Sequence, residues 1–289
     1  MVVCFANYRI VCILSSESNI AINYLDNNKR MKRKVWTLLA AVLVVAGAMA
    51  VGAKAQTTQT ISLNGSPVRL QVSHSIEVKI IPSTKNEMVV EEEGKGGTFK
   101  YTFENGKLTL SREKKSRRRW FNFGEDDIDV KLYVTDVTKL EEVSASGASE
   151  VDIKQSHALN IRKVDLSGAS SFEAQGSLRS TSVILSGASE FDFDGSIQQL
   201  SIDGSGASSV EVDGDISGRL SVDLSGASSM EYKGHVKEAR IEVSGASGFK
   251  GKRASADTAW LEASGASKII LPTNEVKSSS TSGMSSINS

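Results

Sequence analysis

The sequence predicts an all-β protein, a right-handed parallel β-helix that follows an N-terminal β-rich region, and three observations support this fold. The tetrapeptide Ser-Gly-Ala-Ser occurs seven times between residues 146 and 267, at offsets of 19–21 residues, a period typical of stacked repeats. Short runs of alternating apolar and polar residues flank the copies, as in half-buried strands. A Gly recurs at a fixed place between the two runs of most repeats, which is typical of a bend in a strand.

One coil of such a helix cannot bury its apolar face alone, whereas stacked coils share a continuous core. The right hand follows from the general preference of parallel crossovers. Strict alternation through residues 222–232 points Gly226 and Ser228 inward, together with Met230. We therefore interpret the tetrapeptide as architecture, with glycine allowing close backbone approach and the inward serines forming a ladder of hydroxyls between coils.

The beginning of the sequence has the features of a secretory signal peptide at residues 31–55. A basic segment after Met31 precedes an apolar stretch and the cleavage pattern Ala53-Lys54-Ala55. We expect translation to start at Met31, so that residues 1–30 are an upstream misread of the start. An uncleaved membrane anchor is the alternative, but the cleavage pattern favours removal and no stable membrane span is expected afterwards.

The remaining chain divides by its pattern into residues 56–143, rich in predicted strands, and residues 144–289, a β-helix of seven to eight rungs. The segment 281–287 reads as a degraded eighth copy of the repeat. Asn105-Gly106 between two alternating runs predicts a hairpin turn. We expect residues 56–289 to form one continuous domain.

Composition excludes several classes of function. Lys plus Arg and Asp plus Glu number 34 each, so no affinity for nucleic acid is expected. Both cysteines, Cys4 and Cys12, precede residue 31, which removes disulfides and thiolate zinc sites from the exported chain. No motif for a cofactor is present, and none is expected.

A basic and aromatic segment interrupts the strands of the N-terminal region. We interpret it as a candidate site for an anionic polymer or a membrane surface; a solvated loop whose charges neutralise each other is the alternative. The candidate residues are Lys114, Lys115, Arg117, Arg118, Arg119 and Trp120.

Two columns of acidic residues are predicted on the outside of the repeats. One contains Asp165, Asp203, Asp223, Glu242 and Glu262, and the other contains Asp152, Glu173, Asp192, Glu211 and Glu231. Stacked like charges repel, so either solvent and salt screen them or cations bridge them. A solvated acidic face and a calcium-binding face both stay open, with Asp165, Asp203, Asp223, Asp192, Glu211 and Glu231 as the calcium candidates.

The chain resembles the auto-transporter adhesin head GIN domain family of Bacteroidetes. The resemblance covers roughly residues 57–289 and rests on GSPVRLQVSHSIEVKIIPSTKNEMVVE, NGKLTLS, VTKLEEVSASGASEVDI and the serial repeats. It implies an exported protein built of β-helical coils. The family has no agreed catalytic motif, so the resemblance implies no catalytic residue.

We expect a non-enzymatic secreted or envelope protein, an adhesin-like binding or scaffold module that uses an elongated β-helical face. Its partner would be a surface ligand such as a glycan or an envelope protein, in the periplasm, on the outer surface or in the medium. Self-association through an unpaired final coil also stays open.

Two alternatives remain beside the binding module. A polysaccharide-acting β-helix enzyme would need an acid/base pair, but the periodic carboxylates single out no pair. No Lys/Arg cluster is evident on the repeats, and Trp260 is a candidate for stacking on a sugar that a core position explains equally well. The other alternative is a periplasmic scaffold without a ligand.

Overall fold

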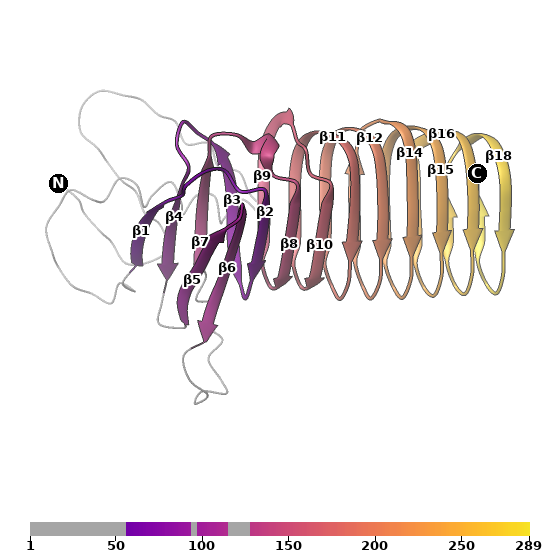
Figure 1. Ribbon diagram of the computed structural model, residues 1–289. Coiled ribbons are helices and arrows are strands. Elements are labelled where there is room, and N and C mark those ends of the chain that lie inside the picture. The colour runs from indigo at the N-terminus through magenta and orange to yellow at the C-terminus, as the bar shows by residue number, and fades with distance from the viewer. Residues whose placement is uncertain (1–55, 94–96, 115–127) are drawn as a thin grey trace, which may run out of the picture. The chain divides into compact units, whose positions relative to one another are not determined.

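The computed structural model describes residues 56–93, 97–114 and 128–289. They form a β-solenoid of about seven turns, which confirms the predicted stack of parallel coils (Figure 1). Its right-handedness stays a prediction. The predicted signal peptide at 31–55 and the upstream residues 1–30 lie outside the described residues. Within the described ranges, no helix is long and apolar enough to cross a membrane.

The described residues form nineteen strands and one short 3-10 helix. In chain order they are β1 (Gln56–Ser62), β2 (Arg69–Ser73), β3 (Ile76–Pro82), β4 (Glu87–Glu93), β5 (Gly97–Glu104), β6 (Lys107–Lys114), β7 (Ile128–Val134), η2 (Val137–Lys139), β8 (Glu142–Gly147), β9 (Glu150–Ala158), β10 (Lys163–Gly168), β11 (Ser171–Leu185), β12 (Glu190–Gly204), β13 (Ser209–Asp213), β14 (Ile216–Leu224), β15 (Ser229–Val243), β16 (Gly248–Ala263), β17 (Lys268–Ile270), β18 (Thr273–Thr281) and β19 (Ser286–Asn288).

Each coil contributes one strand segment to each of two stacks of parallel strands. Layer 1 contains β3, β9, the first halves of β11, β12, β15 and β16, and β13, β17 and β19. Layer 2 contains β2, β8, β10, the second halves of the same four long strands, and β14 and β18. The long strands therefore bend and belong to both layers.

The same parallel stacking continues into the N-terminal region. In layer 2, β2 pairs with β6 and β8, and in layer 1, β3 pairs with β7 and β9. Ser73 is in register with Ser146, so the chain between β2 and β3 forms a corner stacked against the first Ser-Gly-Ala-Ser corner at residues 146–149. His74 adopts a φ of 68° there, although it is not glycine.

Antiparallel strands end the stack on its N-terminal side. β4 pairs with both β1 and β7, and β5 pairs with β6. Asn105 and Gly106, with φ values of 50° and 72°, join β5 to β6. The hairpin predicted at these two residues is confirmed.

The core lies between the two layers and consists of inward side chains stacked from coil to coil. Phe172 and Phe191 are fully buried neighbours whose ring centroids lie 5.5 Å apart at an interplanar angle of 8°. Val210, Met230 and Phe249 continue their column in register. Each such side chain contributes about 1.5–3 kcal/mol when it is removed from water, so the column ties each coil to the next.

The Ser-Gly-Ala-Ser segments form the tight corners between layer 2 and layer 1. Ser228 is buried, as predicted, but the inward position predicted for Gly226 is wrong. Gly226 lies in the exposed part of the corner with a φ of +74°, so the corner interrupts the alternation of the strands. A Cβ on Gly226 would lie 2.6 Å from the carbonyl oxygen of Gly206 in the preceding coil, which explains the glycine.

The hydroxyls of the buried corner serines form hydrogen bonds within their own corner more often than with a serine of a neighbouring corner. The hydroxyl of Ser228 donates to the carbonyl of Ser225, three residues earlier, at 2.8 Å. Among the described residues, one direct hydroxyl contact between corners occurs, from Ser208 to Ser228 at 3.0 Å. The predicted hydroxyl ladder is therefore replaced by local bonds, which also occur at Ser149, Ser170, Ser189, Ser267 and Ser285.

We predict that Gly206→Ala lowers the free energy of unfolding by at least about 1–3 kcal/mol, the cost of holding a non-glycine residue in a strained conformation. Its new Cβ would also lie 2.6 Å from the carbonyl oxygen of Gly187. Gly248→Ala is the matched control, because its Cβ would meet an atom no closer than 3.7 Å and its φ is not positive. Urea unfolding followed by far-UV circular dichroism compares the two, and equal stabilities would contradict the role of the corner glycine.

Candidate functional site

Two adjoining hollows on the outer surface of layer 2 form the candidate site. The first has a volume of about 480 Å³ and the second about 210 Å³, and both are lined by Arg219 and Ser221. We call the two together the arginine groove. Its polar and aromatic lining residues are Asn160, Arg162, Arg179, Ser180, Thr181, Ser182, Gln199, Ser201, Arg219, Ser221, Glu238, Arg240 and Trp260.

The register of layer 2 explains how the groove is built. Ser182, Ser201 and Ser221 follow one another in register from β11 to β12 to β14, and Arg240 and Trp260 continue the same outward column. Strand alternation directs these positions outward while Leu200 and its equivalents face the core. The side chains of the three serines are shorter than those beside them, so the surface is hollowed at the serines.

The first hollow is basic. Its described lining residues include Arg162, Arg179 and Arg219 and no carboxylate. Arg219 donates from Nε and Nη2 to Glu238 at 3.2 and 2.9 Å, and Arg162 Nη2 lies 3.8 Å from Glu141. Arg179 is exposed and makes no hydrogen bond or ion pair with any residue in the described part of the chain. At least one guanidinium of the groove, that of Arg179, therefore has no partner among the described residues that would compete with a bound anion.

The second hollow ends at Trp260, whose side chain is 38% exposed. The sequence left open whether Trp260 lies in the core or on the outer surface, and the structure places it on the outer surface. Arg240 lies in register with Trp260 and donates to Glu242 at 3.1 and 3.2 Å. An exposed indole face beside a guanidinium can stack on a flat or apolar ligand surface.

The expectation that the repeats carry no Lys/Arg cluster is wrong. Arg162, Arg179 and Arg219 stand at different places within their repeats, so no column of the repeat alignment contains all three. Stacking of the coils nevertheless brings them around one hollow. The signal that could have found them is an arginine near the end of the bend in three of the first four repeats, a position where the register varies.

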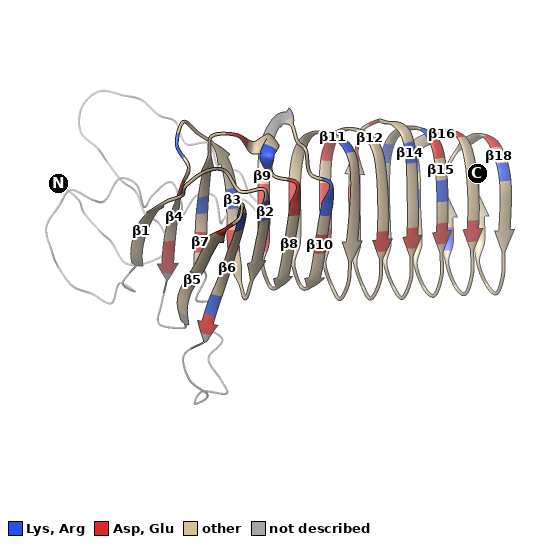
Figure 2. Cartoon of the chain, viewed as in Figure 1, with Lys and Arg blue, Asp and Glu red and all other residues tan. Residues whose placement is uncertain are grey.

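Both predicted acidic columns exist. In layer 2, Asp203, Asp223, Glu242 and Glu262 follow in register from β12 to β16, visible as a row across these strands in Figure 2. Ile184 stands between Asp165 and Asp203 and interrupts this column.

The column of layer 1 runs without interruption from coil to coil and ends at a lysine on either side, Lys79 and Lys250. Its carboxylates are Asp152, Glu173, Asp192, Glu211 and Glu231.

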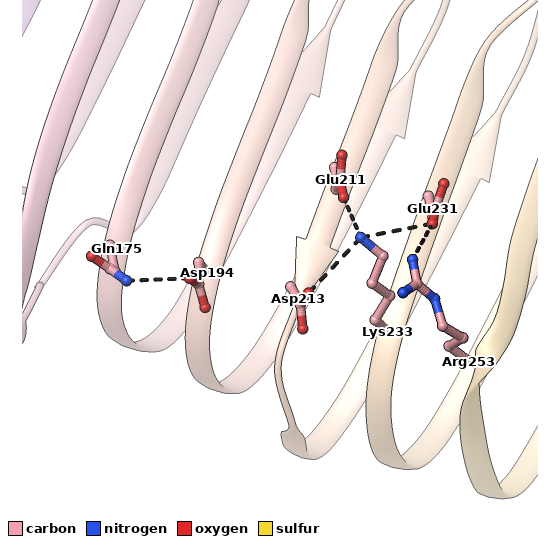
Figure 3. Close-up of polar contacts among 7 residues, drawn as sticks. All are labelled: Gln175, Asp194, Glu211, Asp213, Glu231, Lys233 and Arg253. Carbon is pink, nitrogen blue, oxygen red and sulfur yellow. Dashed lines mark hydrogen bonds and ion pairs between the residues drawn. The ribbon is translucent and has the colours of Figure 1, made fainter. Parts of the chain in front are cut away.

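Two cationic side chains form ion pairs with the carboxylates at the C-terminal end of the layer 1 column. Lys233 Nζ lies 2.5 Å from Glu211, 3.8 Å from Asp213 and 3.7 Å from Glu231 (Figure 3). Arg253 also contacts Glu231, at 3.3 Å. The hydrogen bond to Glu211 raises the pKa of Lys233. Glu211 and Glu231, two of the calcium candidates, are thus neutralised by the protein itself.

A shared metal position is not found among the carboxylates of the described ranges. No group of three or more His, Cys, Asp or Glu residues there is arranged to hold a metal ion. Calcium binding by Asp165, Asp192, Asp203 and Asp223 stays a prediction from the sequence.

The basic and aromatic segment falls almost wholly outside the described residues. The structure describes the backbone of Lys114 at the end of β6 but not its side chain, and it does not describe Lys115, Arg117, Arg118, Arg119 or Trp120. In the chain, the segment connects β6, which pairs with β2 of layer 2, to β7, which pairs with β3 of layer 1. Its proposed role in ligand binding stays a prediction.

We predict that Asp223→Asn raises the melting temperature at neutral pH. Burial, with the neighbouring carboxylates of Asp203 and Glu242, raises the pKa of Asp223 above its ordinary value of 3.8. A raised carboxyl pKa means that ionisation costs the folded state stability, so the cost is present at pH 7 and disappears as the pH falls below about 4. Removing the charge should therefore stabilise the protein only above that pH.

Asp213→Asn in layer 1 is the matched control, since it removes a carboxylate that lies 3.8 Å from Lys233. Differential scanning calorimetry between pH 3 and pH 7 should show stabilisation for the first variant and none for the second. A lower melting temperature for Asp223→Asn at pH 7 would contradict repulsion within the column.

Comparison with solved structures supports the fold. A crystal structure titled "putative lipid binding protein" from Parabacteroides distasonis matches with a TM-score of 0.61 at 16% identity, covering 81% of this chain and 96% of the other. A second structure from the same organism, titled "putative adhesin", matches with a TM-score of 0.51 at 13% identity, covering 82% and 98%. At these identities the similarity shows the fold alone.

Comparison with sequence families identifies the chain more closely. None of the curated proteins matches it. The family model described as "Putative auto-transporter adhesin, head GIN domain" matches residues 66–228 and 210–289, which is more than half of the chain. The chain therefore belongs to the auto-transporter adhesin head GIN domain family, as its repeats and N-terminal strands predict.

Proposed function

We propose that this protein is an exported, non-enzymatic binding module that holds a surface ligand along the outer face of layer 2. The observation that carries the proposal is the arginine groove, which crosses successive coils between Arg162 and Trp260. Membership in an adhesin family supports a role in attachment. The signal peptide predicted at residues 31–55 supports export.

The chemistry of the groove supports binding rather than catalysis. Glycan-cleaving enzymes use two carboxyl groups on either side of the scissile bond. Among its described lining residues the groove has one carboxylate, Glu238, and Arg219 donates two hydrogen bonds to it. The described lining therefore lacks the second carboxyl group that such an enzyme uses.

The architecture of the face also suits binding. Ser201 and Ser221 stand on central strands of layer 2, each paired on both sides along the ladder. The backbone of such strands is already ordered before a ligand arrives, which lowers the entropic cost of binding.

Protease treatment of intact cells tests the proposal against a ligand-free periplasmic scaffold. The proposal predicts that peptides from residues 128–289 are released into the medium while a periplasmic marker stays intact, because an adhesin must face outward. Full protection of these residues beside an intact marker would contradict attachment.

A further inference from the structure

We infer that the ligand of the arginine groove is a linear acidic polysaccharide, carrying carboxylate or sulfate groups along its chain. This inference rests on the proposed function and specifies the ligand of the same face. Three features of the groove lead to it: its basic lining, its hydroxyl-rich floor and its course across the coils to an indole at one end.

The charge of the first hollow selects an anion. Three arginines line a space whose described lining contains no carboxylate. Arg162 and Arg219 are held by weak, exposed ion pairs, which cost little to rearrange, and Arg179 has no partner among the described residues. Guanidinium groups bind carboxylate and sulfate-like oxygens through paired hydrogen bonds.

The floor of the groove selects a ligand with many hydroxyl groups. The side chains of Ser180, Ser182 and Ser201 are exposed and make no hydrogen bond with other residues of the described chain. Asn160 and Gln199 add amide groups in the same hollow. Each of these groups can both donate and accept, as sugar hydroxyls require.

The direction of the groove selects a linear chain. It runs from residues 160–162, which precede β10, across β11, β12, β14 and β15 to Trp260 of β16 at its far end, and neighbouring strands are about 4.8 Å apart. Trp260 can stack on a sugar face, but bases of a single-stranded nucleic acid would require successive aromatic platforms. No second exposed aromatic residue lines the described groove.

The acidic column of layer 2 sets one edge of the site. Asp203, Asp223 and Glu242 each lie two residues after a lining position, on the side toward the corners. Their repulsion would keep a polyanion away from the corners. The groove and this column together confine an acidic chain to one path across the coils.

Binding of the purified full-length protein to heparin, chondroitin sulfate and polygalacturonate, measured by biolayer interferometry, tests the inference. Dextran, poly-glutamate and single-stranded DNA serve as comparison ligands. We expect at least one acidic polysaccharide to bind, more weakly as salt rises, and neutral dextran not to bind. Arg179→Gln should weaken this binding about tenfold, the effect of one charge-assisted hydrogen bond.

Arg253→Gln is the matched control, because Arg253 is an exposed arginine of layer 1 paired with Glu231. Its binding should stay within about twofold of the unchanged protein, a difference below that of one hydrogen bond. Trp260→Ala should weaken binding without changing its salt dependence, and Trp260→Phe should restore part of it. Melting temperatures of all four variants check that each is folded.

The possible outcomes separate the inference from the proposed function. Binding to dextran alone, equal binding to poly-glutamate or DNA, or acidic-polysaccharide binding unaffected by Arg179→Gln would overturn the inference. So would the absence of binding to every acidic polysaccharide. None of these results touches surface exposure, on which the proposed function depends and which the protease experiment measures separately.

Discussion

The hydrogen bond between successive corners is the interaction on which the rest of the structure depends. In the central coils the amide of Ala227 donates to the carbonyl of Gly206, and the amide of Ala207 donates to the carbonyl of Gly187, both at 2.7 Å. The same carbonyl oxygen lies beneath the Cα of the glycine in the next coil, where a Cβ would be too close. The corner thus sets both the spacing and the register of the coils.

This fixed register decides what the outer surfaces can carry. Residues at one position of the repeat form a column, so a repeated carboxylate becomes an acidic row and a repeated serine becomes the floor of a groove. Repulsion is offset locally in the layer 1 row, where Lys233 lies close to both Glu211 and Glu231, whereas it persists around Asp223 in the layer 2 row. The arginine groove arises where short side chains in one column stand beside arginines from several coils.

The sequence predicted the periodic part of the structure and the hairpin at Asn105 and Gly106, but it missed most other aperiodic features. Strand alternation and the repeat length were enough for the coils, both acidic columns and the buried Ser228. Alternation failed at Gly226, because a corner residue with positive φ belongs to neither strand. The coil that contains His74 has no Gly-Ala pair to reveal it, and Arg162, Arg179 and Arg219 share no repeat position.

Hydrogen exchange at the corner alanines tests the central claim most directly. Exposed segments of glycine, alanine and serine ordinarily exchange quickly, since such loops open at little cost in free energy. Here the amides of Ala188, Ala207 and Ala246 should exchange as slowly as those of the flanking strands, because each donates to the preceding coil at 2.7 Å. Rapid exchange at these alanines beside protected strands would contradict the corner as the element that sets the register.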